Sequence, residues 1–109
     1  MHDDRLATIA WSFTALLLVS VAICRLAGRG TIVPNGFVGI RIPSVMYSDA
    51  AWKAGHAAAV VPAVCGFGSA AVCSIAGLVL PVAYWGAIIA FIGAISWMVV
   101  AANRAAGTP

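Results

Sequence analysis

The chain has 109 residues, of which 63% are hydrophobic and only 8% are charged, and its formal net charge is +3. A soluble domain is about 45–50% apolar and about 25% charged, and so small a soluble protein lacks the interior volume to bury this much apolar surface. The composition therefore excludes an ordinary soluble domain and predicts a single membrane domain over residues 1–109. Nucleic-acid binding is not expected, because the basic residues form no cluster with interleaved aromatics.

Three uncharged apolar runs are each long enough to cross a membrane as a helix, which takes about 20 residues. They cover about residues 6–24, 57–80 and 82–102. Pro81 separates the second run from the third, and because a helix does not continue smoothly through proline, we expect a tight turn there. We thus predict an all-α integral membrane protein with three transmembrane helices, in which residues 25–56 connect the first span to the second.

The basic residues are distributed unequally between the two sides of this arrangement. The side with the N-terminal tail and the Pro81 turn holds only Arg5. The side with the 25–56 connection and the C-terminal tail holds the other five of the six basic residues: Arg25, Arg29, Arg41, Lys53 and Arg104. Lys and Arg gather on the cytoplasmic side of membrane proteins and attract anionic membrane lipids. We therefore predict that the N-terminus lies outside and that the connection and the C-terminus are cytoplasmic.

Small residues recur at every fourth position in the second and third runs. In lipid, small side chains let two helices approach closely, and residues four apart share one helix face. We expect the two runs to pack through these faces, although an Ala- and Gly-rich composition can also scatter small residues without a packing role. The series are Ala58, Pro62, Gly66, Ala70 and Ser74 in the second run, and Gly86, Ala90 and Ala94 in the third.

Titratable and metal-binding groups are scarce in the spans. No span carries a charge in its middle, whereas an ion or proton carrier usually needs an ionisable group at depth. Cys24, Cys65 and Cys73 form no CxxC pair and are interpreted as small buried hydrophobic residues. His56 has no second ligand spaced with it. We therefore predict no metal and no cofactor.

The polar side chains gather in residues 33–56, VPNGFVGIRIPSVMYSDAAWKAGH. The Asn35-Gly36 pair that follows a proline predicts a turn, because proline presets φ while Asn and Gly tolerate positive φ. The next residues are mainly apolar, which predicts an extended segment or an interfacial loop. Pro43 should end this segment, since proline cannot donate a backbone hydrogen bond.

A helix is then expected to begin with Ser48 or Asp49 as its cap and to continue into the second run. Spacings of three and four residues place four side chains on one face of this helix near the membrane boundary: Asp49, Trp52, Lys53 and His56. Arg41 is the natural partner of Asp49 if the preceding segment folds back. Two interpretations stay open: the polar residues only anchor the chain, with Trp52 and His56 in the headgroup layer, or they form a functional surface.

The order of these residues resembles the signature of the SdpI family, the SdpI/YfhL-type immunity and signalling proteins of bacterial membranes, in a short three-span form. The similarity lies in Asn35-Gly36-x-x-Gly39-Ile40-Arg41-x-Pro43 and then Ser48-Asp49-x-x-Trp52-x-x-x-His56. It covers roughly residues 8–102, after one apolar run and before two more, with Ile42 where a Thr is expected. The resemblance implies a multi-pass protein of the bacterial inner membrane.

The best-known members of that family protect a producing cell from a secreted peptide toxin and signal by holding a repressor at the membrane. The resemblance therefore implies a non-enzymatic protein whose cytoplasmic connection binds or positions a partner, either another membrane protein or a soluble regulator. The candidates for this contact are Asn35, Gly36, Gly39, Arg41, Pro43, Asp49, Trp52 and His56.

A second hypothesis is a small accessory subunit of a larger membrane complex, such as a transporter, a respiratory enzyme or an envelope-synthesis assembly, or a homo-oligomer. Its motivation is the small size, the lack of a catalytic set and the faces of small residues. An enzyme is not expected, because Asp49 and His56 are separated by about two helical turns, or about 10 Å along the axis.

Overall fold

The computed structural model describes residues 4–107 of the chain, so residues 1–3 and 108–109 of the predicted membrane domain lie outside the described part. Its elements are α1 (Asp4–Gly28), α2 (Pro43–Met46), α3 (Asp49–Gly77), the 3-10 turn η1 (Pro81–Ala83) and α4 (Tyr84–Ala106). No strand occurs between residues 4 and 107, and the segment before Pro43 is irregular. The all-α prediction is confirmed.

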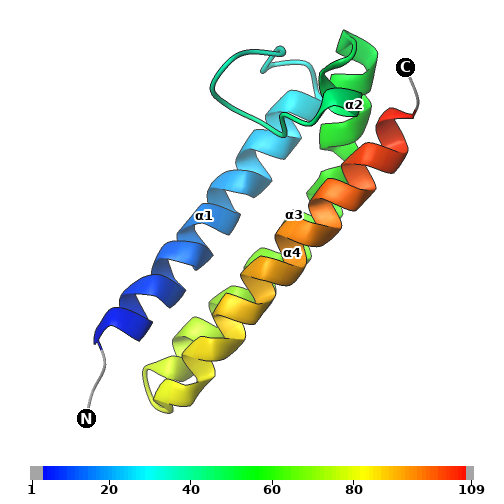
Figure 1. The fold of residues 1–109 in the computed structure, drawn as a ribbon. Helices are drawn as coiled ribbons and strands as arrows, with labels where there is room; N and C mark the ends of the chain where they lie inside the picture. Colours follow the sequence, from blue (N-terminus) through cyan, green and yellow to red (C-terminus); the bar gives the residue numbers. More distant parts are fainter. Residues whose placement is uncertain (1–3, 108–109) are drawn as a thin grey trace.

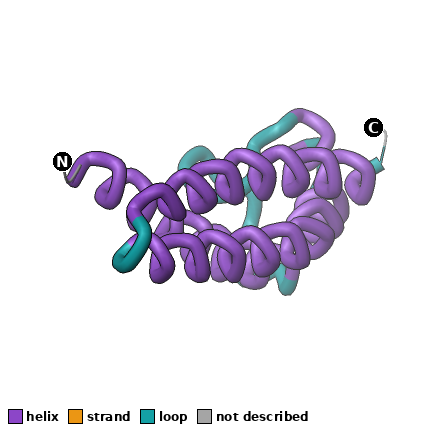
Figure 2. The backbone as a smooth tube through the Cα atoms, turned by 90° about the horizontal axis from the view of Figure 1, so that it is seen from below, coloured by secondary structure: helices purple, strands orange, loops and turns teal. Residues whose placement is uncertain are grey.

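The three long helices α1, α3 and α4 run side by side along a molecule that measures 51 × 20 × 18 Å (Figures 1 and 2). The start of α1 and η1 lie at one end, while the loop of residues 29–42, α2 and the end of α4 lie at the other (Figure 1). Each long helix is long and apolar enough to cross a membrane. The prediction of three helices able to span a membrane is therefore confirmed, and which end faces the cytoplasm stays a prediction.

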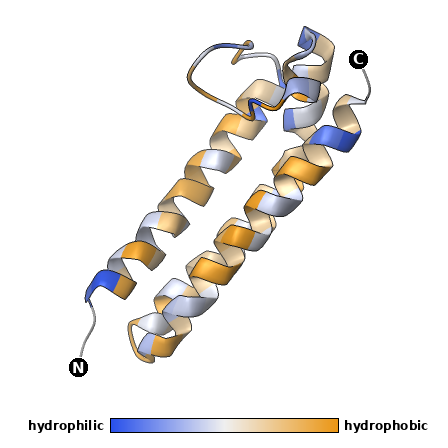
Figure 3. Ribbon diagram, in the orientation of Figure 1, coloured by the Kyte–Doolittle hydropathy of each residue, from blue (hydrophilic) through white to orange (hydrophobic). Residues whose placement is uncertain are grey.

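The outer surface of the bundle is apolar along its length, and the hydrophilic residues gather towards its ends (Figure 3). Leu18, Val72 and Ile89 point outward and are 52%, 68% and 68% exposed. The buried residues between the helices are mostly small, such as Ala10 and Ala63. This distribution suits lipid as the solvent, because lipid tails are as apolar as Leu and the helices associate through close packing of small residues.

Close contacts between small residues bring α3 and α4 together. A Cβ added to Gly66 would lie 2.2 Å from Cβ of Ala94, and one added to Gly86 would lie 2.6 Å from Sγ of Cys73. Ala90 is half-buried in the same interface. The backbones of α3 and α4 therefore approach to a distance that admits no side chain at these two glycines.

The buried line on α3 departs from the strict series of every fourth residue. Pro62, Gly66, Ala70 and Ser74 of that series are buried, and Ala59, Ala63 and Gly77 are buried beside them. Ala58 is only half-buried, whereas the neighbouring Ala59 is completely buried. With 3.6 residues per turn, a step of four residues drifts by about 40° around the helix. Steps of three must therefore alternate with steps of four to keep a line facing its partner.

A buried polar pair joins α1 to α3. The hydroxyl of Thr14 donates to the carbonyl of Ala10 at 2.8 Å, and the oxygens of Thr14 and Ser74 are 2.9 Å apart. Since the Thr14 proton is already donated, Ser74 is the donor between the two hydroxyls. The rings of Phe13 and Phe91 stack with centroids 4.1 Å apart, which links α1 to α4.

The three cysteines have three different environments. Cys24 is buried, Cys73 is half-buried against Gly86, and Cys65 is exposed. The expectation that all three are buried is therefore wrong for Cys65, which lies on the outer surface of α3. An apolar residue on that surface needs no protein partner in a membrane, because lipid solvates it.

Candidate functional site

The candidate site is the loop of residues 29–42, which is held against the first two turns of α3 (Figure 1). Oγ of Ser48 accepts a hydrogen bond of 3.0 Å from the backbone amide of Ala51. Ser48 is therefore the N-cap, which decides between the two residues that the sequence offered. The capped helix continues without interruption into the second span, as predicted, and it carries Trp52 and His56.

His56 is completely buried and links α3 to the loop. The backbone N–H of Ile40 donates to Nε2 of His56 at 2.8 Å. Because Nε2 accepts, the proton of the neutral imidazole is on Nδ1, which donates to the carbonyl of Trp52 at 2.8 Å. Both ring nitrogens are thus occupied in holding the backbone, and neither is available as a catalytic base or a metal ligand in this conformation.

Trp52 holds the other end of the same loop. Its indole Nε1 donates to the carbonyl of Ile32 at 2.8 Å, and its ring lies 4.2 Å from that of His56 between centroids. We call Trp52 and His56 the Trp–His clamp. The two side chains are 1% and 0% exposed. Both side chains are therefore enclosed by the protein, and the depth of this end of the bundle in the membrane stays a prediction.

Gly39 lies directly on the Trp–His clamp with a φ of +112°. A Cβ at this position would lie 2.6 Å from Cη2 of Trp52 and 2.9 Å from Nε2 of His56. Positive φ and the lack of space both demand glycine here. Neither Asn35 nor Gly36 adopts a positive φ, although both residue types tolerate one.

Asn35 organises the turn of the loop through its side chain. Its Oδ1 accepts from the amides of Phe37 and Val38, both at 2.8 Å. Its Nδ2 donates to the carbonyls of Val33 at 2.8 Å and Val38 at 3.2 Å. These bonds satisfy backbone groups that have no helical partner, as Asn side chains commonly do in turns. Gly36, in contrast, has no neighbour within 4 Å of an added Cβ.

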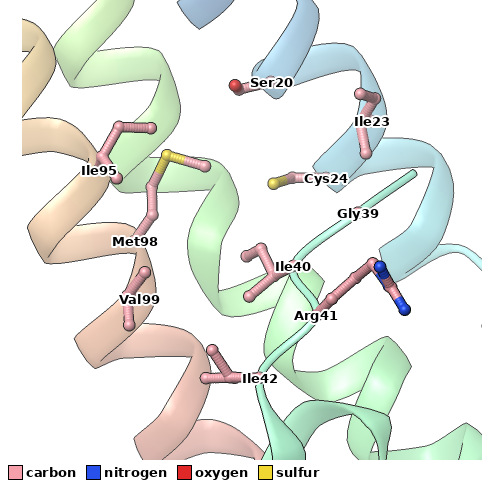
Figure 4. Close-up of a pocket in the computed structure, with 10 residues that line it drawn as sticks. All are labelled: Ser20, Ile23, Cys24, Gly39, Ile40, Arg41, Ile42, Ile95, Met98 and Val99. Atoms are coloured by element: carbon pink, nitrogen blue, oxygen red, sulfur yellow. The ribbon is translucent and has the colours of Figure 1, made fainter. Parts of the chain in front are cut away.

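Arg41, Pro43 and Asp49 lie on the surface around the clamp. Among the residues that the structure describes, no ion pair joins Arg41 to Asp49, so the expected partnership is wrong. Asp49 lies with Lys53 along a hollow beside the start of the loop, whereas Arg41 lines a cavity between α1 and α4 (Figure 4). Pro43 is the first residue of α2, a position at which the helix needs no backbone N–H donor.

The short helix α2 attaches the loop to the ends of α3 and α4, which the sequence did not predict. Val45 is completely buried, and its Cγ2 would lie 2.8 Å from a Cβ on Gly55. The hydroxyl of Ser44 donates to the side-chain oxygen of Asn103 at the end of α4. Pro43, a residue favoured at the first position of a helix, and the apolar Val45 were the sequence signals for α2, and nothing in the pattern pairs Ser44 with Asn103.

The described part of the chain, residues 4–107, holds no group of three or more His, Cys, Asp or Glu residues that could bind a metal ion. Asp49 is exposed while His56 is buried, so the two do not form a pair. This arrangement of residues can hold the loop in one shape at one end of the helical bundle.

A family model described as the SdpI/YfhL protein family matches residues 31–107 of the chain. The match includes most of the loop, α2, α3 and α4, and thus every residue of the Trp–His clamp. No curated protein and no solved structure matches the chain significantly. The family match and the three apolar helices together identify a multi-pass membrane protein.

Proposed function

Because this chain belongs to the SdpI/YfhL protein family, we propose that it is a non-enzymatic immunity or signalling protein of the bacterial inner membrane. In this proposal the loop of residues 29–42 binds or positions a partner at the cytoplasmic face. The observation that carries it is the Trp–His clamp, which fixes the carbonyl of Ile32 and the amide of Ile40 at 2.8 Å each. A surface held in its bound shape loses little conformational entropy when a partner binds.

The residues of the loop and of the Trp–His clamp divide into two groups with different roles. Gly39, Trp52 and His56 are packed against one another, so they act on a partner only through the shape of the loop. Phe37, which is 94% exposed, and the exposed Arg41 are available for direct contact. Aromatic residues and Arg contribute more than most other residues to binding at protein interfaces. This division supports a loop that presents a few side chains on a rigid base.

The cytoplasmic placement of the loop rests on charge. Five of the six basic residues belong to the end of the bundle that carries the loop and the end of α4. An excess of Lys and Arg on one side is typical of the cytoplasmic side. A soluble regulator or the cytoplasmic part of another membrane protein would then have direct access to Phe37.

The experiment that tests the function is deletion of the gene, followed by challenge with membrane-active peptides and with envelope stress. We expect greater sensitivity or altered transcription in the deletion strain, and the wild-type gene should reverse this change. Genes that carry Phe37→Ala or Arg41→Ala should fail to reverse it at normal protein levels. Arg104→Ala, which removes the same charge from the exposed end of α4, should reverse it as the wild type does. An unchanged deletion strain would contradict the proposal.

A photoreactive amino acid in place of Phe37 tests the contact itself. We expect it to form a covalent adduct with one discrete protein in cells. The same residue at Val72, which is 68% exposed on the outer side of α3, is the control. An adduct from position 72 with a stably copurifying subunit, and none from position 37, would instead favour an accessory subunit of a larger complex.

A further inference from the structure

We propose that a cavity beneath the loop binds one acyl chain of an anionic phospholipid, with the phosphate of that lipid at Arg41. The cavity has a volume of about 370 Å³ and lies between α1 and α4, with residues 39–42 as its roof (Figure 4). Ligand cavities in proteins measure about 300–1,000 Å³ and are mainly apolar with a few placed polar groups. This cavity falls within that range and has that composition.

The walls of the cavity are suited to a hydrocarbon chain. Ile23 of α1 and Met98 and Val99 of α4 line it, and Figure 4 shows Ile40 and Ile42 on the same side of the loop as these α4 residues. An apolar cavity excludes water and accepts apolar ligands. Val99 is 38% exposed, so the cavity reaches the outer surface of the bundle, which faces the lipid tails in a membrane. A tail can therefore enter from the side without passing through the protein.

Arg41 is the one charged residue among those that line the cavity. It belongs to the loop, which lies at the end of the bundle where headgroups are expected, and it extends to the opposite side of the loop from Ile40 and Ile42 (Figure 4). It makes no ion pair among the described residues. A guanidinium binds phosphate oxygens in a bidentate manner, and basic pockets between membrane helices bind anionic headgroups.

The geometry places the lipid next to the Trp–His clamp, since the roof residue Ile40 is also the residue that donates to His56. The inference does not rest on the proposed function. It concerns lipid and purified protein alone, and Phe37, the exposed candidate for partner contact, does not line the cavity. Arg41 belongs to both proposals, so partner contact is measured at Phe37, and lipid binding is measured on purified protein without a partner.

The first test measures lipid binding by native mass spectrometry. The purified chain in detergent is titrated with phosphatidylglycerol or with phosphatidylcholine of the same acyl chains, and we expect preferential binding of phosphatidylglycerol. Arg41→Gln should lower the affinity for phosphatidylglycerol about fivefold, the effect of one basic side chain near an anionic lipid. Arg104→Gln, which lies outside the cavity, should leave it unchanged. Equal losses in the two variants, or no loss in either, would overturn the proposal.

The second test fills the cavity. Val99→Phe places a larger side chain in it, whereas Val100→Phe changes a neighbouring residue that is 48% exposed and does not line it. Phosphatidylglycerol with a photoreactive acyl chain should crosslink to the wild type and to Val100→Phe. The yield should fall at least threefold in Val99→Phe. Equal crosslinking of both variants would show that the tail lies elsewhere and would refute the site.

Discussion

The backbone amide of Ile40 donates a hydrogen bond of 2.8 Å to Nε2 of His56, a residue sixteen positions further along the chain. This bond fixes both the position of the loop and the tautomer of the imidazole, because Nδ1 must then donate to the carbonyl of Trp52. A buried histidine beside a polar loop at the membrane boundary suggests a titrating or ligand-binding group. Here its hydrogen bonds are all used to support the loop.

Replacement of His56 by alanine is expected to destabilise the protein. It would leave the amide of Ile40 without its acceptor and create a void, which together lower the free energy of unfolding by about 2–4 kcal/mol. Thermal unfolding of purified protein in detergent, followed by tryptophan fluorescence, measures the change. Cys65→Ala on the exposed face of the same helix should change it by less than about 0.5 kcal/mol. Similar values for the two variants would contradict the role of the clamp.

Gly39 and Gly36 provide a matched pair in the loop. Gly39→Ala combines an unfavourable positive φ with contact against Trp52, whereas Gly36→Ala meets no atom within 4 Å. We expect Gly39→Ala to lower the free energy of unfolding by about 1–3 kcal/mol and Gly36→Ala to have little effect. Limited proteolysis of the loop measures the difference. If the loop is cleaved equally fast in both variants, it is not held in the way that the structure indicates.

The contact between Gly66 and Ala94 predicts a result in the membrane-spanning part. Gly66→Ala should lower the free energy of unfolding by about 1–3 kcal/mol, because the added methyl group overpacks the interface. Gly68→Ala has open space around it and should be neutral or stabilising by up to about 1 kcal/mol, through higher helix propensity. Unfolding in mixed detergent measures both. The double variant Gly66→Ala, Ala94→Gly should recover part of the loss, and no recovery would argue against direct contact.

The orientation of the bundle is tested with reporters. A fluorescent protein fused to the C-terminus should fluoresce, because the excess of basic residues predicts a cytoplasmic end. A phosphatase that is active only outside the cytoplasm should be active when inserted after Val79, which is 90% exposed in the turn between α3 and η1. Opposite results in both fusions would reverse the topology and place the loop outside the cell.

Much of the fold is predictable from local sequence. Three apolar runs predict three helices because the free energy of placing a segment in lipid depends mainly on its own composition. Ser48 as a cap and Asn35 as a turn residue follow from hydrogen bonds within three residues. The partnership of Arg41 with Asp49 was wrong, because it depended on how the loop folds back, which no local pattern specifies.

The sequence by itself determined that the chain is helical and apolar, where its turns fall, and that its polar residues gather between the first two spans. Only the tertiary structure decided that Trp52 and His56 are buried and that the loop covers one side of a cavity. The physical reason is that the clamp binds the carbonyl of Ile32 and the amide of Ile40. Every residue has a backbone carbonyl, and every residue except proline has a backbone N–H. The side chains of Ile32 and Ile40 therefore carry no signal of these contacts.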